Sequence, residues 1–293
     1  MNESVRKRLR ARLSGGPLIV APGIYDAYGA RLVEHAGFEA VYMTGNGVSA
    51  SLLGQPDVGL VDLTLFAQHA HRAAACVDIP LICDADTGYG NAVNVRHTVQ
   101  EFEAAGVAAI HIEDQVSPKR CGQLPGARPV IELGEAVGKI EAAVAARRDP
   151  DFIIIARTDA AEGHGLDEAI KRGRAFRKAG ADAIFVEMKS SATILDDLKR
   201  ITAEVDAPCL VNVAGKVAEL TARDIERLGL RIAIYPGLAR AAAGFAIREA
   251  LAALKRDGNT MALRERMLDL KQYNEVIGLA GVEEWEKKYL QSR

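Results

Sequence analysis

Acidic residues follow two successive apolar runs of this 293-residue chain. Asp84 and Asp86 come after the first run, and Glu113 comes after the second. Carboxylate oxygens without histidine or cysteine among them suit Mg2+, with Mn2+ as the alternative. If Asp84 and Asp86 lie on one strand, their side chains point the same way and both reach one ion. These residues therefore predict a hard-cation site, while the competing interpretation makes Asp84 an ion-pair partner of Arg157.

A cysteine follows the acids in a loop that is rich in cations. Cys121 directly follows Lys119 and Arg120, precedes Gly122, and lies outside every apolar run. Positive charge beside a thiol lowers its pKa from about 8.5, so Cys121 is a candidate acid, unless it is an incidental exposed cysteine. The other cysteines lack CxxC spacing, and Cys83 and Cys209 lie inside apolar runs. We therefore expect neither a zinc site nor a disulfide framework.

Eight apolar runs rich in β-branched residues recur along the chain, with helical stretches between them. Continuous apolar runs are typical of parallel strands that are covered on both faces. A strand followed by a helix, repeated eight times, predicts an α/β fold of the (β/α)8 TIM-barrel type. The expected strands span residues 18–21, 40–43, 80–83, 108–112, 152–156, 183–186, 209–213 and 232–235.

The composition limits the domain organisation and the partners. We expect one barrel domain over residues 1–293, with an N-terminal helix at 1–16 and a C-terminal helical extension at 256–293. A formal net charge of -2, with basic residues scattered among acidic ones, argues against nucleic acid. No apolar run approaches the roughly 18 residues of a membrane span, and residues 1–12 lack a secretory apolar segment. We therefore expect a cytoplasmic protein without a membrane partner.

Polar residues follow nearly every expected strand, where barrels of this kind carry their chemistry. The segment 44–47 offers backbone N–H groups in a glycine-containing nest that suits a carboxylate, although alone it is equally a plain turn. Arg157 ends a strongly apolar run and needs acids or an anionic ligand to offset its buried charge. Its forked guanidinium suits a carboxylate. Further polar residues in such positions are Glu187, Asn212 and Arg240.

These motifs resemble the isocitrate lyase/phosphoenolpyruvate mutase superfamily, and more closely its methylisocitrate lyase and 2,3-dimethylmalate lyase branch. The resemblance covers nearly the whole chain. It rests most strongly on the segments 42–47, 84–90, 111–115, 119–122 and 155–160. It implies a small carboxylate substrate and a homotetramer in which a C-terminal helix exchanges between neighbours. Such an exchange would account for the helices expected after residue 235.

The resemblance also implies roles for individual residues. Asp84 and Asp86 would hold Mg2+, while Asp57 and Glu113 would reach it through water. The implied catalytic residues are Cys121, Tyr42 and Glu113: Cys121 protonates the departing enolate from a mobile loop, and Tyr42 helps with the alkoxide proton. Thr44, Gly45 and Asn46 would bind the carboxylate of the 2-oxo acid portion with help from Arg157. The rest of the implied substrate pocket consists of Cys121, Gly122, Glu187, Asn212 and Arg240.

Four positions bear on the substrate within that family. Gln123 stands where the lyases have histidine, and it cannot titrate near neutral pH. Asn46 stands where they typically have glycine, which narrows the pocket. Leu270 and its neighbour stand where tricarboxylate-cleaving relatives carry an extra arginine, which argues against methylisocitrate. Pro236 resembles the lyases rather than the oxaloacetate hydrolases.

We therefore expect a Mg2+-dependent carbon–carbon lyase. It would cleave a 2-hydroxy dicarboxylate, either a 2-alkylmalate or a methylisocitrate-like compound, into a 2-oxo acid and a smaller carboxylate. Hydrolysis or decarboxylation of oxaloacetate is the main alternative. Chemistry at a P–C bond is disfavoured because the mutase branch carries an asparagine-containing loop where this chain has Cys121. The remaining alternative is a non-catalytic, metabolite-binding relative.

Overall fold

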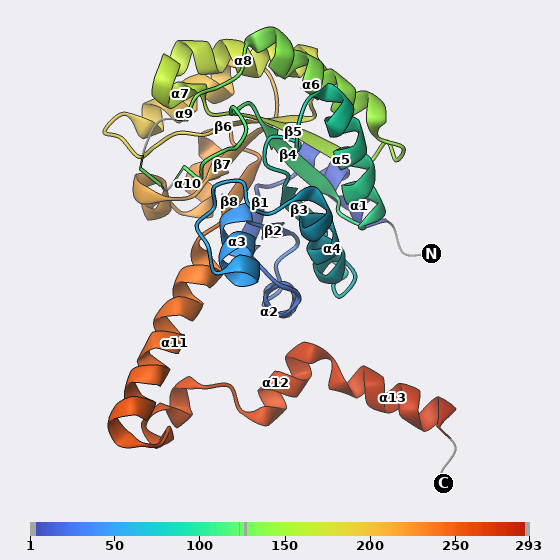
Figure 1. The fold of residues 1–293 in the computed structure, drawn as a ribbon, viewed down its shortest axis with the longest axis vertical. Helices are drawn as coiled ribbons and strands as arrows, with labels where there is room; N and C mark the ends of the chain where they lie inside the picture. Colours follow the sequence, from blue (N-terminus) through green and yellow to red (C-terminus); the bar gives the residue numbers. More distant parts are fainter. Residues whose placement is uncertain (1–3, 123, 126–127, 291–293) are drawn as a thin grey trace.

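Eight parallel strands close into a barrel in the computed structural model, which describes residues 4–122, 124–125 and 128–290 (Figure 1). Each strand pairs with the next along the chain, and β8 returns to β1. The predicted (β/α)8 architecture is therefore confirmed. The strands are β1 (Ile19–Ile24), β2 (Val41–Met43), β3 (Leu81–Asp84), β4 (Ala109–Glu113), β5 (Ile153–Thr158), β6 (Ala183–Val186), β7 (Cys209–Asn212) and β8 (Ile232–Tyr235).

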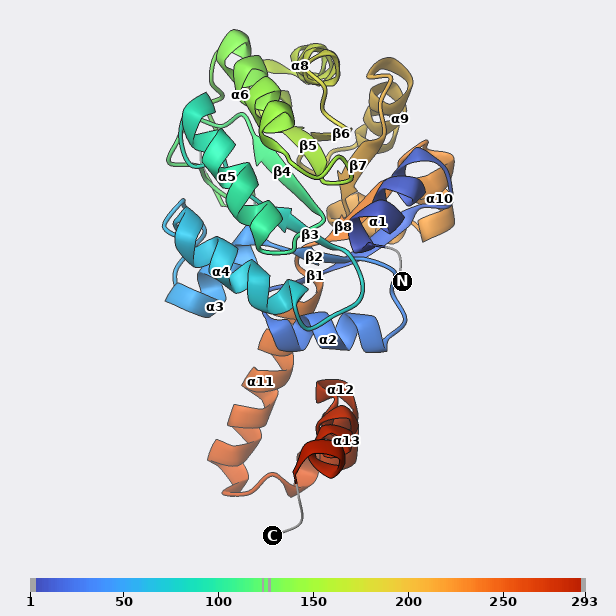
Figure 2. The same cartoon turned by 90° about the vertical axis from the view of Figure 1, so that its right-hand side faces the viewer.

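Helices surround the barrel and extend beyond it (Figures 1 and 2). Leu9 and Leu13 of the first helix pack against apolar side chains of the barrel interior. The helices are α1 (Val5–Ser14), α2 (Ala27–His35), α3 (Gly45–Leu53), α4 (Leu63–Ala74), α5 (Ala92–Ala104), α6 (Leu133–Ala146), α7 (Ala160–His164), α8 (Leu166–Lys178), α9 (Ile194–Glu204), α10 (Ala222–Arg227), α11 (Leu238–Asp257), α12 (Leu270–Ile277) and α13 (Leu279–Tyr289). Two 3-10 turns lie at Gly215–Glu219 and Met261–Arg266.

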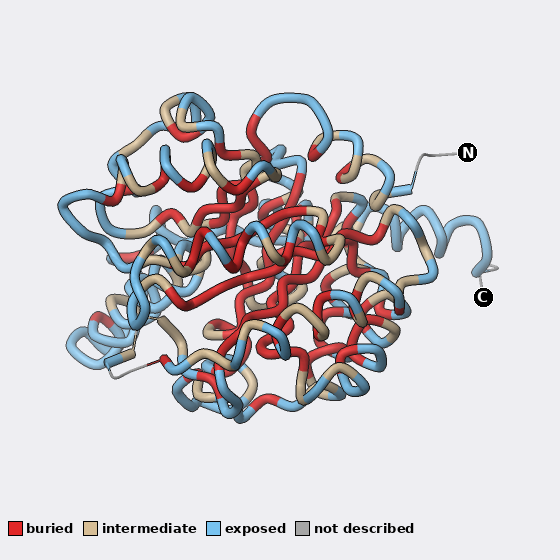
Figure 3. Tube along the Cα trace, turned by 90° about the horizontal axis from the view of Figure 1, so that it is seen from above, coloured by how far each residue is buried: buried red, intermediate tan, exposed pale blue. Residues whose placement is uncertain are grey.

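Side chains of each strand alternate between two cores, which together form the buried centre seen in Figure 3. In β5, Ile153 and Ile155 face the barrel interior, whereas Ile154 and Ala156 face the helices. This is the period of two that a pleated strand imposes. The next position in the inward series is Arg157, at the end of the apolar run. The alternation that fills the barrel therefore also delivers polar side chains to its rim.

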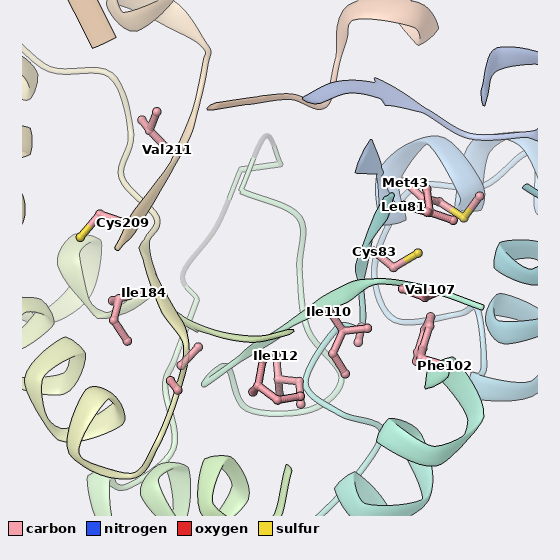
Figure 4. Close-up of a cluster of buried hydrophobic side chains, with 14 of the residues drawn as sticks. Met43, Leu81, Cys83, Phe102, Val107, Ile110, Ile112, Ile184, Cys209 and Val211 are labelled. Carbon is pink, nitrogen blue, oxygen red and sulfur yellow. The ribbon is translucent and has the colours of Figure 1, made fainter. Parts of the chain in front are cut away.

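The outer core contains the two cysteines that lie in apolar runs. Cys83 packs near Met43 and Ile110, and Cys209 lies near Ile184 (Figure 4). Burial raises the pKa of both thiols, that of Cys209 to about 12. Both behave as small apolar side chains, as the sequence indicated.

Strand β1 is longer than its sequence predicted. It continues to Ile24, with Pro22 paired to Tyr235 and Gly23 paired to Tyr42. Proline and glycine usually end a strand, which is why residue 21 was the expected limit. Gly23 is required here because a Cβ atom would lie 2.5 Å from the Tyr235 carbonyl oxygen.

We expect Gly23→Ala to lower the free energy of unfolding by about 2 kcal/mol, because an added methyl group would push β1 away from β8. Urea denaturation would measure the change. Gly138→Ala is the matched control, since its Cβ would meet nothing within 4 Å on α6. That substitution should stabilise the protein by up to about 1 kcal/mol. Equal stability of the two variants would contradict the close approach at Gly23.

The chain leaves the barrel along α11 and ends in an arm formed by α12 and α13 (Figures 1 and 2). Within the helical extension expected at 256–293, the chain forms a 3-10 turn and then α12, because Asp269 caps a new helix by accepting from the Gln272 N–H. Tyr273 contacts Tyr28 of α2, with 5.9 Å between ring centres. The exposed apolar side chains after the barrel include Phe245, Ile247, Leu251, Leu254, Leu270, Val282, Trp285 and Tyr289.

None of the helices in the described parts of the chain combines the length and apolar character that crossing a membrane requires. Helix α13 has no buried residue, and Trp285 on it is 69% exposed. Apolar side chains in such a position leave water when another surface covers them. The arm therefore presents an apolar face that this copy of the chain does not cover.

Candidate functional site

The carboxyl ends of the strands surround one cavity of about 530 Å3. Most of the predicted site residues line it. Gly45 and Asp86 lie beside it, through their contacts with Asp84, while Gln123 lies outside the described residues. The predicted residues that line the cavity are Tyr42, Thr44, Asn46, Asp57, Asp84, Glu113, Cys121, Gly122, Arg157, Glu187, Asn212 and Arg240.

Asp84 and Asp86 do not lie on one strand, so the expected reason for their proximity was wrong. Strand β3 ends at Asp84, and Asp86 adopts a left-handed backbone conformation with φ of 47°. The Asp86 N–H donates to Asp84 Oδ1 at 2.9 Å, and the Asp86 carbonyl accepts from the Glu113 N–H at 2.9 Å. Aspartate tolerates this conformation better than most residues. A tight turn, rather than strand periodicity, brings these acids together.

The Lys119 ammonium lies within the acidic cluster. Its Nζ is 2.7 Å from both carboxylate oxygens of Asp57 and 2.9 Å from Asp86 Oδ1. Burial opposes its charge, but Asp86, Asp84 and Asp57 raise the pKa of Lys119 well above its usual value. The sequence suggested only an influence of this cation on Cys121. The structure gives it a direct contact with the acids instead.

Several buried oxygens at this rim have no well-aligned hydrogen-bond donor among the described residues. They are Asp86 Oδ1 and both carboxylate oxygens of Glu113, although the charged Lys119 Nζ and an Arg157 nitrogen lie near them. Burial raises the pKa of Glu113 and Asp86. Burial also opposes the charge of Asp84, but the charges of His111, Lys119 and Arg157 outweigh it and lower the pKa of Asp84.

These oxygens fit a hard cation that keeps part of its water shell. No group of three His, Cys, Asp or Glu side chains forms a closed metal cage among the described residues. Mg2+ does not need one, because it usually binds one or two carboxylates and retains several waters. The two adjacent carboxylates of Asp84 and Asp86, with Asp57 and Glu113 around them, supply such a donor set.

Arg157 pairs with two acids other than Asp84, so the competing interpretation of an Asp84–Arg157 ion pair was wrong. One guanidinium nitrogen lies 3.1 Å from Glu113 Oε2, and Nε donates to Asp159 Oδ2 at 2.9 Å. Register explains the first contact, because Glu113 of β4 lies directly beside Arg157 of β5. The guanidinium also lies over the Phe185 ring, 5.1 Å from its centre. These contacts fix the orientation of the fork at the cavity wall.

The segment 44–47 is the beginning of a helix rather than a turn. Thr44 precedes α3, and the Gly45 N–H donates to Asp84 Oδ2 at 3.3 Å. The two glycines suggested a turn, but they are required by close packing. A Cβ at Gly45 would lie 2.7 Å from Asp84 Oδ2, and one at Gly47 would lie 2.7 Å from the Tyr25 Cβ. A helix N-terminus, like the expected nest, presents free N–H groups that suit an anion.

Cys121 is held at two of its atoms. Its Sγ accepts a hydrogen bond from Asn46 Nδ2 at 3.2 Å, and its backbone N–H donates to the Asp57 carbonyl at 3.0 Å. Gln115 fixes the preceding residue, since its side chain accepts from the Arg120 N–H and donates to the Arg120 carbonyl. The half-buried thiol therefore lies at the cavity, on a loop that hydrogen bonds hold at residues 120 and 121.

The sequence missed a buried tyrosine–histidine pair. The Tyr42 hydroxyl and His111 Nε2 are 2.8 Å apart, and His111 Nδ1 lies 3.7 Å from Asp84 Oδ1. Burial lowers the pKa of His111 to about 4, so its ring is neutral near pH 7. His111 lies within β4, so a search for polar residues at strand ends does not find it. The signal that identifies it is the inward series formed by residues 109, 111 and 113.

Arg128 is a second residue that the sequence did not single out. Its guanidinium pairs with Asp159 and Glu162, and it is almost completely buried. A Cβ at Gly122 would lie 3.0 Å from Arg128 Nη1 and 3.3 Å from Glu187 Oε1. Glycine at position 122 therefore lets the loop pass close to these two charged groups.

The far wall of the cavity carries the remaining polar groups. Asn212 Nδ2 donates to Glu187 Oε1 at 3.4 Å, while no residue in the described part of the chain donates to Glu187 Oε2. Burial raises the pKa of Glu187. Arg240 reaches the cavity from the first turn of α11. This wall can thus present a donor, an acid and a cation to a ligand.

The closed barrel and the acidic, cysteine-bearing rim at its carboxyl end define a TIM-barrel protein whose functional face is the strand-end face. Residues 9–255 match the family described as phosphoenolpyruvate phosphomutase. The chain belongs to the phosphoenolpyruvate mutase/isocitrate lyase superfamily, as its motifs predicted.

Known relatives include enzymes with different reactions. The chain is 43% identical over 288 residues to 2,3-dimethylmalate lyase of Eubacterium barkeri, which covers 98% of each chain. It is 38% identical over 278 residues to 2-methylisocitrate lyase of Shewanella oneidensis, which covers 93% of this chain and 94% of the relative. It is also similar to the structure of phosphonopyruvate hydrolase in complex with oxalate and Mg2+, with a TM-score of 0.90, 34% identity and coverage of 99% and 100%. The chain is thus an enzyme of a superfamily that includes lyases and hydrolases.

Proposed function

We propose that this protein is a carbon–carbon lyase that cleaves a 2-hydroxy dicarboxylate, of the 2-alkylmalate or methylisocitrate type, into a 2-oxo acid and a smaller carboxylate. The observation that carries the proposal is the position of Cys121, which lines the same cavity as Asp84 and Arg157. A proton donor, a carboxylate cluster and a cation are the groups that such a cleavage requires. The 43% identity to 2,3-dimethylmalate lyase supports it.

Asp84 and Asp86 would hold Mg2+ directly, with Asp57 and Glu113 reaching it through water, and Mn2+ would suit the same oxygens. When bound, the ion would stabilise negative charge that develops on the 2-oxygen of the substrate. Support comes from the buried oxygens without donors and from the Mg2+ in the phosphonopyruvate hydrolase complex.

The substrate carboxylate beside the 2-hydroxyl would bind at the N-terminus of α3, formed by Thr44, Gly45 and Asn46, with Arg157 as the counter-charge. The second carboxylate would face Arg240 across the cavity. Glu187, Asn212 and Gly122 would complete the wall there, since all of them line the cavity.

Cleavage needs one proton removed and one supplied. The 2-hydroxyl proton would pass to the Glu113 carboxylate, the electron pair of the carbon–carbon bond would go to the departing fragment, and the Cys121 thiol would give its proton to that fragment and remain as thiolate. Burial makes Glu113 a stronger proton acceptor, and its pKa is raised. Burial likewise keeps Tyr42 protonated, so its hydroxyl would hold the substrate oxygen while His111 fixes its position.

A panel of substrates with Mg2+ tests the proposal. It should contain 2,3-dimethylmalate, 2-alkylmalates, isocitrate and methylisocitrate, with 2-oxo acid formation as the readout. Release of oxalate from oxaloacetate, without cleavage of any malate, would replace the lyase by a hydrolase. Binding of Mg2+ in calorimetry without turnover of any 2-hydroxy or 2-oxo acid would indicate a metabolite-binding relative instead.

We also propose that the protein forms a homotetramer in which the C-terminal arm packs on a neighbouring copy. The supporting observation is the apolar face of α11 to α13, with Trp285 at 69% and Leu270 at 74% exposure. Isolated apolar side chains are common on surfaces, but many of them on one projecting arm are typical of an interface.

We expect the double variant Leu270→Glu/Trp285→Glu to form a smaller species than the wild-type protein, because two charges would have to be buried in the interface. Size-exclusion chromatography with light scattering gives the mass. Val93→Glu is the matched control, since Val93 is 77% exposed on the barrel side helix α5. An unchanged mass in the double variant would remove the arm from the interface.

A further inference from the structure

We propose that Asn46 is a positioning residue, whose side-chain amide orients the Cys121 thiol and holds its loop over the cavity. The inference rests on the proposed function in one respect, namely that the thiol gives its proton to the departing fragment. The Asn46 side chain would thus act on Cys121, whereas the backbone N–H groups at the start of α3 suit a substrate carboxylate. The contact that carries it is the 3.2 Å hydrogen bond from Asn46 Nδ2 to Cys121 Sγ.

The direction of this hydrogen bond matters for the thiol. An amide NH2 group only donates, so sulfur uses a lone pair toward Asn46. The contact with Asn46 therefore does not use the S–H bond, and both residues line the cavity. With the Cys121 N–H donating to the Asp57 carbonyl at 3.0 Å, the residue is fixed at its backbone and at its sulfur.

Asn46 itself has a fixed position relative to the acids. It is the second residue of α3, and the preceding Gly45 N–H donates to Asp84 Oδ2. No side chain fits at Gly45, where a Cβ would lie 2.7 Å from that oxygen. Helix α3 is thus seated directly on Asp84. Through Asn46, the same helix sets the distance between the thiol and the acidic cluster.

The proton transfer explains why a donor is needed at position 46. When the S–H bond breaks and a C–H bond forms on the departing fragment, negative charge stays on sulfur. The Asn46 amide then faces that charge with its N–H group. An aspartate of the same shape would instead present an acceptor, which would draw the S–H away from the substrate and then repel the thiolate.

A first experiment needs no turnover. Alkylation of Cys121 by iodoacetamide is followed by mass spectrometry, with Cys76 of the same chain as internal reference. Iodoacetamide reacts with the thiolate, which the Asn46 N–H stabilises, so Asn46→Ala should react about threefold more slowly than wild type at a fixed pH. Ser51→Ala, on the exposed side of the same helix, should react like wild type. Equal rates for Asn46→Ala and wild type, with equal melting temperatures, would overturn the proposal.

A second experiment uses the cleaved substrate. We expect kcat to fall about tenfold in Asn46→Ala, with KM within twofold of wild type, and about a hundredfold in Asn46→Asp. A raised KM with unchanged kcat would assign the side chain to substrate binding and contradict positioning. The two hypotheses fail separately. If wild type cleaves no substrate but the alkylation rates still differ, only the proposed lyase function is wrong. If wild type cleaves substrate and the Asn46 variants behave like it, only the role of Asn46 is wrong.

Discussion

Replacement of Asp84 by asparagine should reduce turnover by about a thousandfold or more, because the cluster would lose its most strongly ionised carboxylate. The charges of His111, Lys119 and Arg157 lower the pKa of Asp84 although it is buried. The lowered pKa favours the anionic form of Asp84, which is the form that binds a cation. Its neighbours Asp86 and Glu113 have raised pKa values and depend on other charges to ionise.

The change should act on charge while the barrel stays folded. Asparagine has the shape of aspartate, and an oxygen in the place of Oδ1 still accepts from the Asp86 N–H. Its NH2 group would face the Gly45 N–H, which we expect to cost about 1 kcal/mol of stability. A steady-state assay, a Mg2+ titration by calorimetry and a thermal melt separate these effects.

Asp167→Asn is the matched control, since Asp167 is exposed and forms its one ion pair within the described part of the chain with Arg200. It should keep full turnover and full Mg2+ affinity. If Asp84→Asn bound Mg2+ as tightly as wild type, Asp84 would not be a ligand, and Asp86 with Asp57 would be the remaining pair. The loss of turnover would then have to arise through Gly45 and the N-terminus of α3.

The barrel was predictable because its evidence is distributed over the whole chain. Each strand is an apolar run on its own. The similar segments 104–110 and 178–184 each place a glycine where a helix ends and the next strand is about to begin. The structure puts Gly106 and Gly180 at positive φ, as that position requires. Errors at single residues do not alter such a pattern; for example, β1 was expected to end at residue 21, before Pro22, but continues to Ile24.

The site was less predictable because its geometry depends on backbone and charge across separate strands. The positive φ of Asp86 and the packing of Gly45 against Asp84 have no counterpart in residue type or spacing. Lys119 belongs to the loop by sequence but to the acidic cluster by position. One signal was present in the sequence and was not used: every second residue of a strand faces the barrel interior, and this alternation reaches His111 in β4 and Arg157 in β5.

Replacement of Cys121 by serine should lower kcat for carbon–carbon cleavage by about a hundredfold to ten-thousandfold, because an alcohol is a far weaker acid than a thiol. Mg2+ affinity and KM should stay close to wild type. The Asp57 carbonyl still accepts the backbone N–H, and the Asn46 amide can donate to a serine oxygen. The loop would therefore keep its place while losing its proton donor.

Cleavage in deuterated water shows where the proton comes from. A thiol fixed by Asn46 and Asp57 delivers its deuteron to one face of the departing carbon, so wild type should give a single stereoisomer of labelled product from a suitable substrate. Residual cleavage by Cys121→Ser should give label on both faces, because bulk water replaces the fixed donor. An unchanged rate with unchanged stereochemistry would exclude Cys121 as the acid.

The donor would then have to be another group at the cavity. Lys119 is a poor candidate, because its raised pKa makes it a weak acid.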